Sequence, residues 1–160
     1  MGRLAPSTYK PHLSFRFKIQ FSDLPNIQFY GKASTLPEVS NNPLSVEYGN
    51  TYMMVKGKTR WSEVTITCYA YENMTHTELW NYLNRMHQDV GLGTDMYPDD
   101  YKKDIYIYLL NPQDRPVCAW RLIGAFMSGL RNGTADWASE EIIQPEITIA
   151  YDYAQYIEQA

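Results

Sequence analysis

The residues of this sequence that could do chemistry are few and scattered. The only histidines are His12, His76 and His87, and none belongs to an HExxH motif or to a recognisable nucleophile motif. His76 and His87 lie about three helical turns apart, which is too far for both to bind one metal ion. We therefore interpret all three as surface or cap residues.

Carboxylates and glycines give no better candidate. The paired acids, at positions 99–100 and 140–141, are adjacent in loops, where consecutive side chains point apart and cannot share a proton. The acidic stretch 95–104 lacks the alternating ligands and closing Glu of a calcium loop, so we interpret it as a solvated loop. The Gly-Leu-Gly at 91–93 lacks the third glycine of a dinucleotide fingerprint. The sequence predicts no catalytic, cofactor or metal site, and so no enzyme.

The two cysteines are Cys68 and Cys118, and each lies within a strand-like run. They form no CxxC pair and offer no zinc-binding pattern. We expect two buried thiols, with a disulfide between subunits as the alternative.

Composition narrows the classes of function. The chain has 160 residues, enough for a single domain (1–160) with its own core. A net charge of −4 without clustered Lys and Arg argues against tight nucleic-acid binding. There is no apolar run of about 18 residues and no signal-peptide pattern, so we expect no stable membrane association and folding in a cytoplasm. The 14 Tyr and 4 Trp favour β structure and broad contact surfaces.

The clearest local signal is that of one helix across residues 74–93, with its body at 75–90. Thr75 suits the N-cap, Glu78 completes a capping box, and Gly91 suits the C-terminal stop. The apolar positions recur every three or four residues and share one face: Leu79, Leu83, Met86 and Val90. A helix with one apolar stripe must cover something, and its neighbours are strands.

Most of the remaining chain alternates with the period of two that is typical of half-buried strands. The runs lie at 15–21, 27–33, 45–48, 51–56, 64–70, 105–109, 117–127 and 147–153. We expect the first two to form a hairpin through a four-residue loop at 23–26, and residues 37–43 to be a turn-rich interruption. We expect the strand at 117–127 to be buried on both faces, with Gly124 and Gly129 as bulges. Residues 1–13 are interpreted as an extended arm.

A long hairpin across residues 41–60 has no evident partner within a small domain. Gly49-Asn50 suits its tight turn. Its apolar residues form an exposed patch, which usually marks an interface. The predicted interface residues are Val46, Tyr48, Tyr52, Met53, Met54 and Val55. The element order thus predicts a mainly β (α+β) fold with one flanking helix and a protruding hairpin.

Several local patterns occur in a characteristic order. They are Phe-Arg-Phe-Lys-Ile at 15–19, the segment 29–37 ending in Leu-Pro, the hairpin at 46–57, Trp-Ser-Glu-Val-Thr-Ile-Thr at 61–67, and Glu-Ile-Thr-Ile-Ala-Tyr-Asp-Tyr at 146–153. In this order the chain resembles, across residues 14–154, the tail tube protein of contractile-tailed bacteriophages.

The resemblance implies two packed antiparallel sheets that form a small barrel or sandwich. It implies that six copies close into a ring and that rings stack into a hollow tube inside a contractile sheath. Such a tube conducts DNA into the host without binding it specifically. The implied partners are further copies of the chain, the tail sheath protein, and baseplate and tail-terminator proteins. The implied location is the virion, after assembly in the host cytoplasm.

On the same resemblance, the hairpin contacts the neighbouring ring, and strands of all subunits join into one sheet around the lumen. We take Glu146, Thr148 and Asp152 as lumen-lining candidates and expect Arg16 and Lys18 to pair with acids of an adjacent strand. Two alternatives stay open. One is the tube protein of a type VI secretion system or another contractile injection device, and the other is a monomeric β-barrel that binds a ligand.

Overall fold

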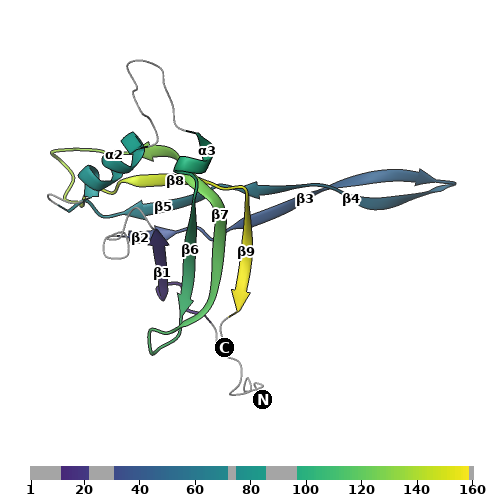
Figure 1. The fold of residues 1–160 in the computed structure, drawn as a ribbon, viewed down its shortest axis with the longest axis horizontal. Coiled ribbons are helices and arrows are strands. Elements are labelled where there is room, and N and C mark those ends of the chain that lie inside the picture. Colours follow the sequence, from purple (N-terminus) through teal and green to yellow (C-terminus); the bar gives the residue numbers. More distant parts are fainter. Residues whose placement is uncertain (1–11, 22–30, 72–74, 86–96, 159–160) are drawn as a thin grey trace.

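The structure is a computed structural model that describes residues 12–21, 31–71, 75–85 and 97–158. The described part is mainly β, with two helices (Figure 1). Its elements in chain order are β1 (Phe17–Phe21), β2 (Gly31–Ser34), β3 (Glu38–Tyr48), β4 (Thr51–Ser62), β5 (Val64–Cys68), α2 (Thr75–Arg85), α3 (Pro98–Tyr101), β6 (Lys103–Leu110), β7 (Pro116–Arg131), β8 (Glu146–Ala150) and β9 (Tyr153–Glu158).

Two antiparallel sheets share the long strand β7. Strand order is β1-β6-β7-β8-β5-β2, with β9 paired to the first half of β7. Figure 1 shows β1, β6 and β9 running across the direction of β5 and β8, so the two sheets cross. Among the described strands no pairing joins β1 to β2, and the sheet is therefore not closed into a barrel. The predicted mainly β fold with two packed antiparallel sheets is confirmed.

The core lies between the two sheets and the helix α2. Its residues are mostly aliphatic, and burying each of the large ones contributes about 1.5–3 kcal/mol. They include Ile19, Ile66, Leu79, Ile105, Ile107, Leu122, Met127, Ile147 and Ile149. The ring of Tyr82 on α2 meets that of Phe21 edge to face, with centroids 6.5 Å apart.

The predicted apolar stripe of the helix is confirmed where it is described. Leu79 is fully buried, and Leu83 is partly buried against the core. The helix begins at Thr75, as expected. The last part of the predicted helix, with Met86, Val90 and Gly91, lies outside the described residues.

Two predictions about strand pairing are wrong. The first two strands do not form a hairpin with each other, because β1 pairs with β6 and β2 pairs with β5. Alternation identifies a half-buried strand but not its partner. Residues 37–43 are not an interruption either, because β3 begins at Glu38 and accommodates Pro43 at a register shift. A two-stranded hairpin consists of edge strands, which tolerate Pro.

Two further elements differ from the sequence-based expectation. The last strand is not continuous through residue 153, since β8 ends at Ala150 and β9 starts a separate pairing at Tyr153. The short helix α3 was not predicted, although Pro98 at its start and Asp99 and Asp100 in its first turn are good start signals.

β7 matches its prediction. Every residue from Val117 to Met127 is buried or half-buried. Two of its register shifts fall at the two glycines: two residues of β7 around Gly124 face one of β6, and another shift lies between Met127 and Gly129. These bulges bend β7 from one sheet into the other.

The bend is fixed by residues 123–124 and 152. Gly124 has φ +66, the left-handed region that favours glycine. The backbone N–H of Asp152 donates to the Ile123 carbonyl at 3.0 Å, and the Asp152 carboxylate occupies the space that a Cβ on Gly124 would need. Lys102 holds that carboxylate from the other side, with Nζ to Oδ1 at 2.8 Å.

Replacing Gly124 with Ala should therefore lower the free energy of unfolding by about 1–3 kcal/mol, because the side chain meets both an unfavourable φ and the Asp152 carboxylate. Gly129→Ala is the matched control: a Cβ there meets Thr148 Cβ at an ordinary 3.7 Å. Urea denaturation of both variants measures the difference. Equal losses of stability would contradict this account of the bend.

Candidate functional site

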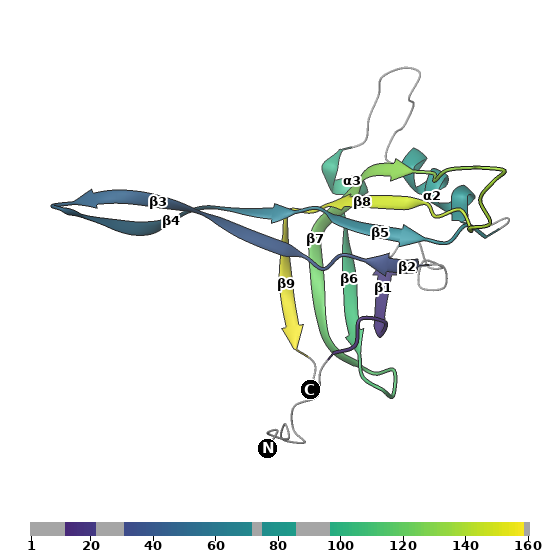
Figure 2. The ribbon, with the colours of Figure 1, turned by 180° about the vertical axis from the view of Figure 1, so that it is seen from behind.

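The hairpin of β3 and β4 projects far from the body of the molecule (Figures 1 and 2). Its strands pair from Glu38 opposite Ser62 to Tyr48 opposite Thr51. Gly49 takes φ +59 in the turn, and the Thr51 hydroxyl donates to the Tyr48 carbonyl at 3.0 Å. The predicted Gly49-Asn50 turn is confirmed, and the hairpin is longer than the predicted 41–60.

Every residue of the hairpin is exposed or half-buried, including large apolar ones. The exposed fractions of Tyr48, Tyr52 and Met54 are 76%, 71% and 62%. Because directly paired residues share a face, one face carries Leu44, Val46, Tyr48, Met53 and Val55, and the other carries Tyr52 and Met54. A two-stranded hairpin alone is marginally stable, and such a patch normally serves contacts with other molecules.

All six predicted interface residues thus lie together toward the outer end of the hairpin. Five are exposed, and Val55 is half-buried. The prediction missed two exposed apolar residues of β3, Val39 and Leu44. The alternation of Leu44 with Val46 would have identified the second of these.

A second surface is the outer face of the sheet formed by β1, β6, β7 and β9. The opposite face carries core residues such as Ile19 and Ile107. Two rows of paired residues cross the outer face. They are Gln20, Tyr106, Arg121 and Gln155 in one row, and Lys18, Tyr108, Ala119 and Ile157 in the other. The rings of Tyr106 and Tyr108 stack with centroids 5.9 Å apart.

Two charged residues of this face, Arg121 and Asp104, are paired within the subunit. Arg121 Nε donates to Asp104 Oδ2 at 2.8 Å, and the guanidinium lies over the Tyr106 ring at 6.0 Å. The hydrogen bond to Asp104 raises the pKa of Arg121, so this residue stays charged. The face therefore combines aromatic and amide groups with an internally neutralised ion pair.

The two basic residues near β1 have different surroundings. Arg16 Nη1 lies 3.8 Å from Asp114 Oδ1, so Arg16 pairs with an acid of the β6–β7 turn rather than with the expected acid of an adjacent strand. Lys18 is exposed, and it makes no ion pair with the described residues.

The three lumen candidates do not share one surface. Glu146 and Thr148 are half-buried on β8, where they pair with β5 and β7 in the other sheet. Asp152 lies at the bend between β8 and β9, bound to Lys102. Sequence alternation placed all three on one strand face, and the bend separates Asp152 from the other two.

The sheet of β1, β6, β7 and β9 has two open edges. β1 pairs only with β6, and β9 only with β7, within the part of the chain that the structure describes. Unpaired edges of this kind expose backbone donors and acceptors that can pair with another chain.

Among the described residues, the side chains that could act as nucleophiles or metal ligands do not form a cluster. Cys68 and Cys118 are free and buried, which confirms the expected buried thiols, and burial raises the pKa of Cys68 to about 12. Across the described ranges, no three His, Cys, Asp or Glu side chains gather as metal ligands would. None of the described helices is both long and apolar enough to span a membrane.

Among the described strands the hairpin pairs with no other strand, and the β1-β6-β7-β9 sheet has open edges. Over residues 13–155 the sequence matches the family described as T4-like virus tail tube protein gp19. The chain therefore belongs to this tail tube family, whose members are structural proteins. No curated protein matches the sequence.

Solved structures of tube assemblies share the fold. The chain is similar to a protein in the tube-terminating cap of the anti-feeding prophage, with TM-score 0.77, 17% identity, and 96% and 95% of the two chains covered. It is also similar to a chain of the sheath–tube complex of the extracellular contractile injection system PVC, with TM-score 0.76, 20% identity and 95% coverage of both chains. A type six secretion system protein is more distant, with TM-score 0.53, 10% identity, and 88% and 81% covered.

Because the hairpin lies apart from the core, Met54→Asp should change the free energy of unfolding by no more than about 0.5 kcal/mol. Leu79→Asp places a charge in the fully buried core and should abolish folding. Urea denaturation followed by circular dichroism compares the two variants. Equal effects would refute the separation of the hairpin from the folding core.

Proposed function

We propose that this chain forms hexameric rings that stack into a hollow tube inside a contractile sheath, and that the tube conducts DNA into a host cell. The observation that carries the proposal is the long hairpin, which contributes no residue to the buried core and exposes several large apolar side chains. The membership of the tail tube family supports it.

Ring closure uses the open edges of β1 and β9. When β9 of one copy pairs with β1 of the next, the four-stranded sheets of all subunits join into one sheet around a central passage. The two edges are different surfaces, so the contact is heterologous and closes through rotation. Closure also removes the exposed edges that would otherwise invite aggregation.

The passage is lined by the outer face of this joined sheet, because its other face packs against the core. The wall residues are then Lys18, Gln20, Tyr106, Tyr108, Arg121 and Gln155. Asp104 neutralises Arg121, so the attraction of the wall for DNA is limited to that of Lys18, which has no ion-pair partner among the described residues. The half-buried face of β8 with Glu146 and Thr148 is the alternative wall.

The hairpin makes the contact between rings. Burial of Val46, Tyr48, Tyr52, Met53, Met54 and Val55 against a neighbouring ring contributes the apolar driving force for stacking. The sheath protein, baseplate and tail terminator are the further partners of the tube, which assembles in the host cytoplasm before it becomes part of a phage tail. A contractile injection device is the second candidate setting, favoured by the fold shared with the injection-system chains.

Negative-stain microscopy and sedimentation of the purified protein test assembly. We expect rings or tubes from the native sequence, no stacked tubes from Met54→Asp, and normal tubes from Asn81→Asp, a charge change on the exposed side of α2. A dispersed monomer at high concentration would contradict the proposal and favour a monomeric ligand-binding protein instead.

A second experiment distinguishes the two candidate walls. Gln155→Lys adds a positive charge to the outer face of the β1-β6-β7-β9 sheet, and Thr148→Lys adds one to β8. Assembled Gln155→Lys tubes should retain short duplex DNA in a salt-sensitive manner, whereas Thr148→Lys tubes should not. Co-sedimentation with labelled DNA measures retention, and the reverse result would make β8 the wall.

A further inference from the structure

The loop between β7 and β8 encloses an open hollow of about 990 Å³. Its two stems are held close together at the body of the molecule. Gly133 has φ +91, and a Cβ there would lie 2.7 Å from Ile143 Cγ2. The far stem is fixed to the chain after β5, where the Ala70 N–H donates to the Ile143 carbonyl at 2.9 Å. The hollow is therefore built into the fold at one end of the β7–β8 sheet.

The rim of this hollow is apolar and acidic. Trp137 is fully exposed, and Ile142 is 60% exposed. Asp136 and Glu141 also line the hollow, and both are exposed, as is the neighbouring Glu140. A solvent-exposed indole beside an open hollow is a feature of binding surfaces, because Trp is enriched where apolar area becomes buried between proteins.

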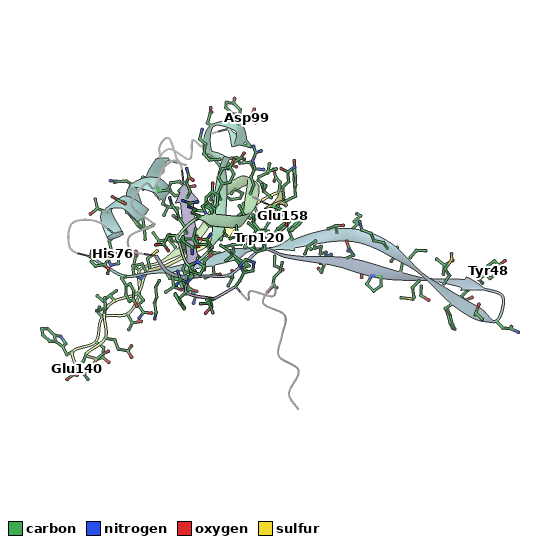
Figure 3. The ribbon with its side chains drawn as sticks, turned by 90° about the horizontal axis from the view of Figure 1, so that it is seen from below. Tyr48, His76, Asp99, Trp120, Glu140 and Glu158 are labelled. Atoms are coloured by element: carbon green, nitrogen blue, oxygen red, sulfur yellow. The ribbon has the colours of Figure 1, made fainter. Side chains whose placement is uncertain are left out.

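The loop and the hairpin lie at opposite ends of the molecule. Figure 3 shows Tyr48 near the end of the hairpin on one side and Glu140 on the projecting loop on the other. Two different apolar surfaces at opposite ends allow copies to join head to tail, since each copy can present its hairpin to the loop of the next.

The charges of the two surfaces are complementary in sign. Toward its end the hairpin carries Glu47, and nearer the body it carries Lys56 and Lys58. The loop is mainly acidic: Asp136, Glu140 and Glu141 lie toward its tip, and at its stem Glu146 pairs opposite Arg131. Lys56 pairs opposite Pro43, four residues from Glu47, so the opposite charges on the hairpin are separated by about 13 Å.

We propose that the hollow formed by residues 131–146 receives the hairpin of a second copy of the chain. The end of the hairpin enters first, with Tyr48 and Tyr52 in the hollow. Lys56 and Lys58 then face Asp136 and Glu140 on the rim, and Trp137 covers the apolar side of the hairpin. The contact rests on the proposed stacking of rings and names the acceptor surface for the hairpin.

A charge exchange tests this contact. Lys58→Glu and Glu140→Lys should each raise the protein concentration needed for tube formation roughly tenfold, and the double variant should restore it. The control combines Lys58→Glu with Glu63→Lys, which makes the same charge change at an exposed position outside the loop and should not restore assembly. Recovery in the control as well, or no recovery in the exchange, would overturn the proposed pairing.

Disulfide trapping tests the direction of entry. Both native cysteines are buried, so a crosslink reports on the engineered thiols alone. Asn50→Cys with Thr134→Cys should give crosslinked multimers under mild oxidation, because the hairpin end reaches the stem of the loop. Asn50→Cys with Ser139→Cys, at the tip of the loop, should not. Tubes that form without the first crosslink would overturn this inference and leave the tube function standing, whereas a native protein without tubes would overturn both.

Discussion

The bend at Gly124 and Asp152 is the constraint on which the rest of the structure depends. It lets β7 pair with β6 and β9 in one sheet and with β8 in the other, so one strand joins two crossing sheets around a common core. The left-handed conformation of Gly124 and the ion pair between Asp152 and Lys102 hold the geometry. Because the sheets cross, the outer face of the β1-β6-β7-β9 sheet and its two open edges remain available to neighbouring copies.

Folding and assembly are carried by different parts of the chain. The core between the sheets and α2 contains the fully buried residues that stabilise the subunit. The hairpin contributes none of them, although it exposes several large apolar side chains. A free subunit would gain little from such a hairpin, since an isolated pair of strands is marginal in water. Its apolar residues lose contact with water only when another molecule covers them, which ties their stabilising effect to association.

The structure could be predicted from the sequence alone where a local pattern determines it. The stripe at Leu79 and Leu83, the Gly49-Asn50 turn and the buried run of β7 were all predictable, as was the apolar character of the hairpin. The partners of β1 and β2 were not, because alternation carries no information on pairing. The bend at Asp152 could not be predicted, because the alternation of apolar and polar residues continues through Tyr153 as if the strand were unbroken. For the same reason the lumen candidates could not be assigned to a face before the register of β7, β8 and β9 was known.

The joining of sheet edges is the central claim about this subunit, and a cryo-electron microscopy reconstruction of the assembled protein tests it most directly. We predict that β9 of each copy is hydrogen bonded to β1 of the next, with Gln155 and Gln20 facing the axis of the ring. A reconstruction in which β1 and β9 remain unpaired, or in which their outer face points away from the axis, would contradict the account.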